Sequence, residues 1–332
     1  MIITRAPLRI PLGGGGTDFA SYYNKYGGYL LGFACNLYVY VVIHPILEPK
    51  IHLKYSKNEV VEATEEGLDR LENRIAAEAI RYIGLDKLVG NGGLEVATFS
   101  DVPESSGLGG SSSFVCSLLL CLKNLAKPYD YYSPDRLFGD AFHVERELAG
   151  IPGGMQDQFF AAKGGASVVV LSKESTTTSD IDLSGFIENL YLVYTNSTRT
   201  SLDIATNQID KTENLDTHMI NSLDKVKEIG YRIEDLIHVH SYVEVAQMFT
   251  THWKSKMDRD PGIVTPEMYD VWDSCVIAGA LGGKLIGLGG GGYFLMYSLE
   301  SLESIGGIPV DIAKNGAELV LRSNREEVSY AL

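Results

Sequence analysis

The chain has 332 residues, of which 45% are apolar and 21% are charged, and its formal net charge is -15 at pH 7. This composition predicts a globular protein with one large or two ordinary domains. The negative charge argues against nucleic acid or an anionic membrane as a partner, because either would be approached against the protein's own field. The N-terminal segment has no charged region followed by an apolar run, so we expect a cytoplasmic protein without a signal peptide.

Cysteine usage agrees with that expectation. The four cysteines lie in apolar stretches and form no CxxC pair; they are Cys35, Cys116, Cys121 and Cys275. This pattern is typical of reduced core residues and not of a disulfide framework. The longest uncharged run, 26–43, contains glycines and alternates in its second half, which predicts a strand and not a membrane span.

Short strands alternate with helices in the first half of the chain. Apolar periodicity and turn residues predict strands at 2–10, 37–43, 50–55, 94–99 and 165–171. Helices are expected at 19–26, within 60–85, after the serine-rich loop at 107–113 and after the Ser133-Pro134 start. The polar run 173–182 is interpreted as a domain boundary or an exposed turn.

The second half begins with a predicted strand at 190–194 and continues with helices over roughly 201–255. Pro266 opens a further helix, which Gly282-Gly283 is expected to end. The apolar stripe of that helix is Met268, Val271, Trp272, Cys275 and Val276. Residues 284–297 follow as two short strands around a run of glycines, so the second half is predicted to be α+β.

The stretch Asp101–Leu125 runs from a glycine and serine loop straight into an apolar helix. Its glycines let the backbone approach an anion, and the unpaired amides at the helix start point toward it with the positive end of the helix dipole. Serine hydroxyls add ligands for phosphate oxygens or for a magnesium ion. The junction is therefore a candidate phosphate site, and an ordinary capped helix is the alternative.

Glu145 lies on the apolar stripe of the helix that starts at Pro134, because it follows Phe138, Ala141 and Phe142 at helical spacing. A buried carboxylate needs a metal ion, an arginine or a hydrogen-bonded network as a partner. The alternative is a carboxylate at the edge of the stripe that reaches solvent.

Two other stretches have an unusual composition. Gly13–Gly16 contains more glycines than a tight turn uses, which favours a loop in contact with a ligand. Residues 150–158 break the chain with further glycines before Asp157, whose simplest interpretation in isolation is a helix cap.

Four stretches taken in order resemble the GHMP small-molecule kinases, the kinases of galactose, homoserine, mevalonate and phosphomevalonate. They are Arg5–Arg9 with Gly16-Thr17-Asp18, then Pro103–Ser113, then Glu145 twelve residues before Asp157, then Lys284–Gly292. Within that superfamily, the GGGGTD, GxxQDQF and TxxxR stretches are most similar to the D-glycero-D-manno-heptose 7-phosphate kinases.

The resemblance implies an α+β, two-domain GHMP kinase fold. Residues 1–185 would form an N-terminal α/β domain with a left-handed βαβ crossover, and residues 186–332 a ferredoxin-like α+β domain. The handedness comes from the resemblance alone, since crossovers are right-handed in about 98% of cases. A monomer or a homodimer is expected.

The resemblance also implies ATP and Mg²⁺ as cofactors. Glu145 and Ser111 would hold the metal ion, Asp157 would accept or orient the proton of the attacking hydroxyl, and Arg9 would offset charge on the transferred group. The ATP phosphates would be bound by Pro103, Ser106, Gly107, Leu108, Gly109, Gly110, Ser111, Ser112 and Ser113. No GxxxxGK[ST] motif occurs, so this loop would work without the lysine of a Walker loop.

For the acceptor, the resemblance implies the anomeric hydroxyl of the heptose phosphate, giving a 1,7-bisphosphate and ADP. Implied substrate-binding residues are Arg5, Gly14, Gly15, Gly16, Thr17, Asp18, Gly154, Arg199, Gly290 and Gly291. Arg199 is the candidate cation for the acceptor's phosphate, and a surface arginine at a helix start is the alternative. A kinase of a neutral sugar such as fucose and a noncatalytic sugar-phosphate sensor stay open.

The chain departs from related motifs at a few places. Gly110 stands where many relatives carry serine, Gly14 and Gly15 replace a glutamate and a histidine of galactose kinases, and Leu8 replaces a frequent glycine.

Other chemistries fit less well. A zinc deaminase would need PCxxC after His143-Val-Glu145, no HExxH occurs, and the glycine run at Gly13 satisfies the dinucleotide motif only loosely.

Overall fold

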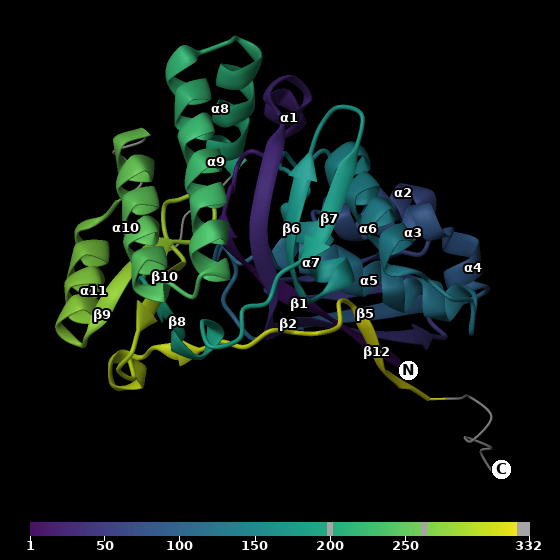
Figure 1. Cartoon of the computed structure of the whole chain (residues 1–332). Coiled ribbons are helices and arrows are strands. Elements are labelled where there is room, and N and C mark those ends of the chain that lie inside the picture. Colours follow the sequence, from purple (N-terminus) through teal and green to yellow (C-terminus); the bar gives the residue numbers. More distant parts are fainter. Residues whose placement is uncertain (198–201, 260–263, 324–332) are drawn as a thin grey trace.

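The structure, a computed structural model, describes residues 1–197, 202–259 and 264–323. Two β-sheets lie side by side, each with its own helices (Figure 1). The larger sheet contains β1 (Ile2–Gly13), β2 (Gly28–Ile46), β3 (Lys50–Lys54), β4 (Asn58–Glu62), β5 (Gly93–Ser100), β6 (Ala166–Leu171), β7 (Thr176–Asp180) and β12 (Glu318–Arg322). The smaller sheet contains β8 (Leu190–Tyr194), β9 (Ala280–Leu285), β10 (Tyr293–Ser298) and β11 (Ile308–Pro309).

Helices occupy most of the remaining described chain. They are α1 (Ala20–Tyr26), α2 (Glu65–Leu68), α3 (Arg74–Ile83), α4 (Leu85–Val89), α5 (Gly110–Ala126), α6 (Pro134–Phe142), α7 (Gln156–Lys163), α8 (Leu202–Glu213), α9 (Thr217–His238), α10 (Tyr242–Arg259) and α11 (Pro266–Ile277). Within the described ranges, none of them combines the length and the apolar character that a membrane crossing requires.

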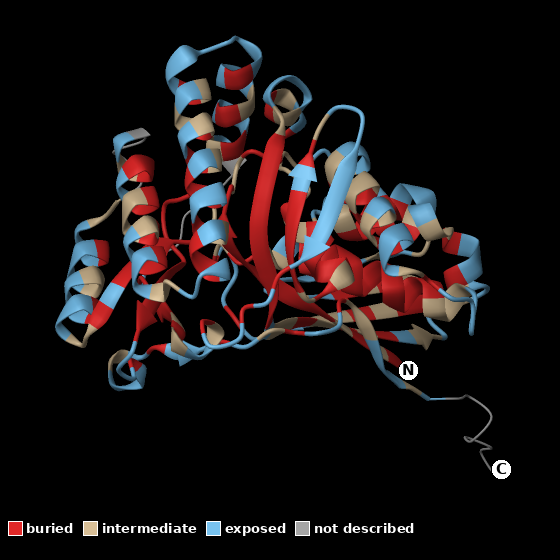
Figure 2. Ribbon diagram, in the orientation of Figure 1, coloured by how far each residue is buried: buried red, intermediate tan, exposed pale blue. Residues whose placement is uncertain are grey.

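The larger sheet has the order β12-β1-β2-β5-β3-β4, with β6 and β7 continuing from the other end of β2. Strand β1, which lies between β12 and β2, is buried along nearly its whole length (Figure 2). Helix α5 packs on β1, and Thr4 donates a hydrogen bond to the carbonyl of Ser117 on that helix. Helix α9 also contacts β1, where Gly13 meets Gly230 at backbone contact. The strand that was predicted at 2–10 therefore extends to Gly13.

Helix α5 is buried on all sides from Ser112 to Lys123, which is why its sequence is apolar beyond one stripe (Figure 2). On this helix, Phe114, Leu118, Cys121 and Leu122 are buried, and Leu125 lies at the edge of the core. Close packing against β1, β2, α3 and α7 holds the helix in place. Its N-terminus is thereby held rigidly where the serine loop ends.

The smaller sheet has the order β11-β8-β10-β9, and all of its pairings are antiparallel. In chain order this is fourth, first, third, second, which is the ferredoxin-like arrangement. Helices α8 to α11 connect β8 to β9, whereas only a short 3₁₀ turn at Glu303–Ile305 lies between β10 and β11. The expected α+β class is confirmed.

Two expectations were wrong in detail. The run 173–182 contains β7, an exposed edge strand that pairs with β6, so the turn is confined to its first residues. Helix α11 ends at Ile277, and Gly282 and Gly283 lie inside β9. A Cβ at Gly282 would come within 2.2 Å of the Ala246 carbonyl oxygen, so close packing of α10 on the sheet explains that glycine. In the α11 stripe, Val276 is 51% exposed.

The end of the described chain returns to the larger sheet, where β12 pairs with β1 in antiparallel register (Figure 1). The division into 1–185 and 186–332 stays a prediction, as does the handedness of the crossover that connects the parallel pair β3 and β5. The four cysteines are buried and free, as expected.

Candidate active site

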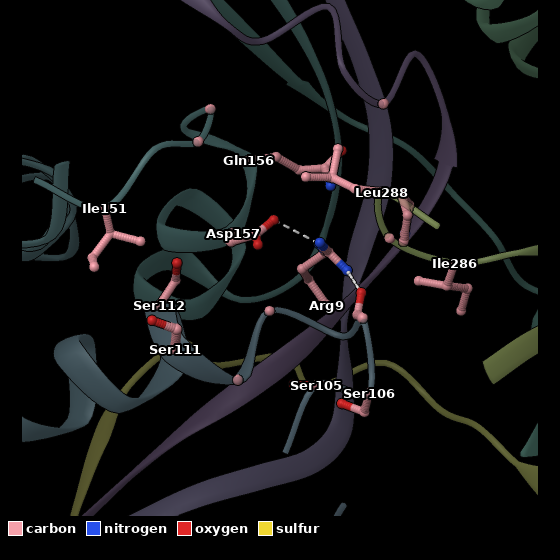
Figure 3. A pocket seen from close by; sticks show the side chains of 18 of the residues that line it. Arg9, Ser105, Ser106, Ser111, Ser112, Ile151, Gln156, Asp157, Ile286 and Leu288 are labelled. Carbon is pink, nitrogen blue, oxygen red and sulfur yellow. Dashed lines mark hydrogen bonds and ion pairs between the residues drawn. The ribbon is translucent and has the colours of Figure 1, made fainter. Parts of the chain in front are cut away.

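A cavity of about 480 Å³ opens between the larger sheet's side of the molecule and the glycine loop that joins β9 to β10. On one side lie the loop 103–112 and the start of α5, and on the other Ile286 and Leu288 (Figure 3). The loop 13–18 and the start of α7 form a third wall. Four of the sequence stretches discussed above thus meet at one place.

The geometry of the loop 103–112 depends on glycine at the helix start. Gly109 precedes α5 with φ 82°, in the left-handed region that side chains rarely adopt. A Cβ there would lie 3.3 Å from side-chain carbons of both Arg9 and Asp157. Gly107 has φ 77°, and a Cβ added to it would lie 3.1 Å from the Ile286 carbonyl oxygen. These glycines bring the loop backbone close to both walls.

Glu145 is 1% exposed and lies on a π-helical turn, His143–Leu148, that continues α6. Its Oε1 accepts a hydrogen bond from the Ser111 hydroxyl at 2.6 Å, and its Oε2 accepts one from Ser112 at 2.7 Å. Gln158 Nε2 donates to Oε2 at 2.7 Å, and the guanidinium of Arg146 lies 3.3 Å from Oε1. The inward carboxylate therefore has the hydrogen-bonded network and the arginine that its burial requires.

The pair Ser111 and Glu145 fits a magnesium ion held jointly with substrate phosphates. Mg²⁺ prefers hard oxygen ligands, and in phosphoryl-transfer sites it is typically bound by one or two carboxylates together with phosphates and waters. A hydroxyl and a carboxylate oxygen already meet here at the helix N-terminus. No group of three or more His, Cys, Asp or Glu side chains is placed for metal binding in the described part of the chain, so an all-protein metal cage is absent there.

Arg9 and Asp157 form an ion pair in the floor of the cavity (Figure 3). Arg9 Nε donates to Asp157 Oδ1 at 2.7 Å, and Arg9 Nη1 donates to the carbonyl of Gly107 at 2.5 Å. Arg9 is 6% exposed, whereas the Asp157 side chain keeps 24% of its surface accessible. Asp157 lies in the first turn of α7 and does not cap it, because Met155 precedes the helix. Its carboxylate is thus oriented by Arg9 and open to a ligand.

Asp18 is the second carboxylate at this end of the cavity. It is 6% exposed and accepts hydrogen bonds from the amides of Gly16 at 3.2 Å and Gln156 at 2.9 Å. Burial raises the pKa of this carboxyl above its usual range, and the hydrogen bond from the Gln156 amide opposes that rise. Gly154 is packed so closely that a Cβ would lie 2.0 Å from Asp18 Oδ2.

The structure brings most of the sequence-predicted site residues to the cavity wall. These are Arg9, Gly15, Gly16, Asp18, Pro103, Ser106, Gly107, Gly109, Gly110, Ser111, Ser112, Glu145, Gly154, Asp157 and Gly291.

Others lie away from the cavity and have structural contacts. Thr17 donates its hydroxyl to the carbonyls of Gly14 and Tyr29 and so fixes the glycine loop to β2. Ser113 donates to the Pro7 carbonyl, and Arg5 pairs with Glu318 over the Tyr38 ring. Outside the lining are also Gly14, Leu108 and Gly290, and Arg199 falls outside the described residues.

Several lining residues were not singled out from the sequence. Lys284, Lys256 and His252 contribute buried basic groups from β9 and α10, and Gln208 on α8 donates to the Gly16 carbonyl at 2.8 Å. On α10, His252 and Lys256 are four residues apart on an otherwise core-facing side. Polar residues at core positions of a helix were the available signal. Lys284 stands between apolar strand residues, which is the same kind of signal.

The comparison with known proteins follows this geometry. The family model "GHMP kinases N terminal domain" matches residues 73–165, which contain the serine loop, Glu145 and Asp157. A D-glycero-alpha-D-manno-heptose 7-phosphate kinase of Campylobacter jejuni is 27% identical over 315 residues, covering 89% of this chain and 89% of the relative. Residues 73–165 therefore match the GHMP kinase N-terminal domain, and the two similarities together support a phosphotransferase enzyme.

Two further similarities bear on the rest of the chain. A crystal structure described as that of a D-glycero-D-manno-heptose 1-phosphate kinase from Bacteroides thetaiotaomicron has a TM-score of 0.73 at 22% identity, covering 98% of this chain and 100% of the other. This similarity supports the fold. An L-fucokinase/L-fucose-1-P guanylyltransferase of Bacteroides fragilis is 24% identical over 331 residues, and the match covers 89% of this chain but 34% of that longer protein.

Proposed function

We propose that the protein is an ATP- and Mg²⁺-dependent kinase that transfers the γ-phosphoryl group to the anomeric hydroxyl of D-glycero-D-manno-heptose 7-phosphate. The products are the 1,7-bisphosphate and ADP. One observation carries the kinase chemistry: the Arg9–Asp157 ion pair and the Ser111–Glu145 pair line the same cavity. The choice of acceptor is supported by the similarity to the heptose 7-phosphate kinase of Campylobacter jejuni.

Asp157 is the group that would accept or orient the proton of the acceptor hydroxyl. Its Oδ1 is held by Arg9, which leaves Oδ2 for a ligand. Arg9 would at the same time stabilise negative charge that develops on the transferred group, because a guanidinium in a water-poor site acts strongly on phosphoryl oxygens. Phosphoryl transfer needs mainly positioning and charge neutralisation, and these two side chains provide both.

The phosphates of ATP would bind at the start of α5. The amides there are unpaired within the helix and carry the positive end of its dipole, and Gly109 lets the backbone approach. A Mg²⁺ ion bound by Glu145 and Ser111 would supply the positive charge that offsets the phosphate oxygens.

We assign the nucleotide base to one part of the cavity, the base chamber. Its lining residues are Val39, Tyr55, Asn73, Ile75, Thr98, Ser100 and Val102. The hydroxyl oxygen of Thr98 is buried and has no hydrogen-bond partner among the described residues. A planar ligand with polar edges would occupy this mostly apolar chamber and satisfy that hydroxyl.

The acceptor sugar would lie on the other side of Asp157. Asp18 accepts hydrogen bonds from two amides there and can also receive sugar hydroxyls, and the Gln156 side chain lines the same end. The Gln156 Oε1 atom is buried without a hydrogen-bond partner in the described part of the chain. A polyhydroxylated ligand would satisfy it.

The deciding experiment measures ADP release with ATP and Mg²⁺ across a panel of acceptors. The panel contains D-glycero-D-manno-heptose 7-phosphate, sedoheptulose 7-phosphate, mannose 6-phosphate, fucose, galactose and mevalonate. Turnover confined to the aldoheptose phosphate is the expected result. Turnover of fucose instead would favour the alternative that the Bacteroides fragilis relative suggests, and ATP binding without any turnover would favour a sensor on the same fold.

Arg199 remains our proposed cation for the acceptor's phosphate, on the sequence alone. Replacing it by alanine should raise KM for the phosphorylated sugar and leave KM for ATP nearly unchanged, because only the acceptor carries that phosphate. An equal effect on both substrates would remove Arg199 from this role.

A further inference from the structure

Lys284 is a buried cation in the cavity wall, near the end of β9. The residue is 2% exposed, and its Nζ donates a hydrogen bond to the carbonyl of Leu12 on β1 at 2.7 Å. Its ammonium lies 5.1 Å from the centre of the Phe249 ring on α10. Among the described residues, no carboxylate lies within ion-pair distance of this ammonium.

Other basic side chains line the same cavity as Lys284. From β1 it faces Arg9, and from α10 the cavity receives His252 and Lys256. Of the carboxylates that line the cavity, Asp157 is engaged with Arg9, Asp18 with backbone amides and Glu145 with serine hydroxyls. In the described part of the chain, none of these carboxylates forms an ion pair with Lys284. Burial first, and then the charge of Arg9, lower the pKa of Lys284 to about 7.

A purely structural role does not account for the charge. The hydrogen bond to Leu12 connects β9 with β1, but a carbonyl requires only a donor, and contact with Phe249 would suit an apolar chain of the same length. A buried ammonium without a counter-ion is costly, so an anion that enters the cavity would gain from it.

We propose that Lys284 binds a phosphate oxygen of a ligand in the active site. An ammonium has three donors, and the carbonyl of Leu12 uses one, which leaves two for the ligand. The assignment rests on the proposed kinase function and refines it. The phosphate has two sources, the acceptor sugar's own phosphate and the phosphoryl group in transit from ATP, and the experiment separates them.

The first measurement is proton uptake on binding, by titration calorimetry at pH 8 in two buffers that differ in ionisation enthalpy. The probes are D-glycero-D-manno-heptose 7-phosphate and, separately, the magnesium complex of a non-hydrolysable ATP analogue. A lysine with a pKa of about 7 is roughly one-tenth protonated at pH 8, so binding of an anion beside it should draw in about one proton. The phosphate itself is already dianionic there, since its second pKa is about 6.

Lys284→Met should abolish this uptake, and Lys284→Arg should retain binding without it, because arginine stays charged. Lys123→Met is the matched control, since Lys123 is also buried but pairs with Asp130 far from the cavity. It should leave uptake and KM unchanged. Thermal melting of each variant checks that it folds.

Turnover of the same variants identifies the source of the phosphate. If the acceptor's phosphate is bound, Lys284→Met raises KM for the heptose phosphate at least tenfold with little change in kcat. If the phosphoryl group in transit is bound, kcat falls tenfold or more at unchanged KM. The assignment would be overturned if the wild-type protein took up no proton with either probe. It would also be overturned if Lys284→Met took up as many protons as the wild-type protein. Proton uptake without turnover of any sugar phosphate would instead support the binding role of Lys284 and reject the proposed kinase function.

Discussion

The two walls of the cavity differ in how their charges are compensated. On the wall formed by α5, the π-helical turn His143–Leu148, α7 and the loop at 13–18, the carboxylates of the site have partners within the protein: Glu145 has hydroxyls, an amide and an arginine, and Asp157 has Arg9. On the opposite wall, the ammonium of Lys284 has one hydrogen-bond acceptor, the carbonyl of Leu12. The first wall is prearranged without a ligand, whereas the second contains a cation that a ligand would complete.

The two walls also differ in the conformation and packing of their backbones. Helix α5 is fixed by a buried surface on all sides, but the loop between β9 and β10 is nearly all glycine, with positive φ at Gly287 and at each residue from Gly289 to Gly292. Two of these glycines touch the phosphate loop: a Cβ at Gly292 would lie 2.1 Å from the Ser106 carbonyl oxygen, and one at Gly287 would lie 2.9 Å from the Gly107 Cα. Contact between the walls is therefore made backbone to backbone.

The largest effect is expected on the prearranged wall. Asp157→Asn keeps the size of the side chain and an oxygen for Arg9, so the protein should fold normally. It removes the proton acceptor, and kcat should fall by about 10²- to 10⁴-fold. ADP release measures this, with circular dichroism as the check on folding. Turnover at the wild-type level would exclude Asp157 from the reaction.

Next in size is the change Glu145→Gln. The amide fits the space but lacks the negative charge that a magnesium ion requires, so the Mg²⁺ concentration for half-maximal rate should rise about tenfold to a hundredfold. A titration of rate against Mg²⁺ at saturating ATP tests this. An unchanged Mg²⁺ dependence would mean that Glu145 serves only to hold the two serine hydroxyls in place.

Contact between the two walls can be tested with Gly292→Ala. The added Cβ collides with the Ser106 carbonyl, so the walls must separate, and KM for ATP should rise about tenfold, or about 1.4 kcal/mol. Gly306→Ala is the matched control, because Gly306 has φ 82° and open space around its Cβ position. Both substitutions place a side chain at a positive φ and therefore strain the backbone, but only Gly292→Ala should separate the two walls. Equal KM values for the two would contradict the close contact.

The smallest effect concerns stability. Lys284→Met removes a buried charge at the expense of one hydrogen bond, and Tm should rise by about 2–4 °C near pH 6.5. Between the folded pKa of about 7 and the ordinary value of 10.5, the unfolded chain binds more protons than the folded one, so wild-type stability increases with pH in that interval. The advantage of the variant should therefore shrink from pH 7 toward pH 10. A gain that is independent of pH would indicate that Lys284 is not the group that titrates.

Local signals in the sequence were sufficient to place the glycine and serine loop at the start of α5 and to place Glu145 inward. Helical spacing placed that carboxylate inward, and burial then required the partners that Ser111, Ser112 and Gln158 provide. The expected meeting of Arg9 and Asp157, in contrast, came from resemblance, since 148 residues separate them and no periodicity connects such a distance.

Long-range packing explains what the sequence did not reveal. Gly282 is required by the approach of α10, and β7 is a strand because β6 offers it an edge, although its threonines are exposed. Thr17 was expected to bind substrate, and its hydroxyl instead connects two backbone segments. Each of these features depends on a neighbour that is distant in sequence, and local composition does not reveal such a neighbour.

The position of β12 bears on how the polypeptide reaches this state during synthesis. β1 leaves the ribosome long before β12, yet among the described residues one of its edges pairs with β12, as in the pair Ile2 and Arg322. Contacts of such high sequence separation slow folding, and an unpaired edge of a hydrophobic strand invites association with other chains. The nascent protein would therefore benefit from chaperone protection until β12 has been synthesised, and expression of residues 1–185 alone would leave that edge open.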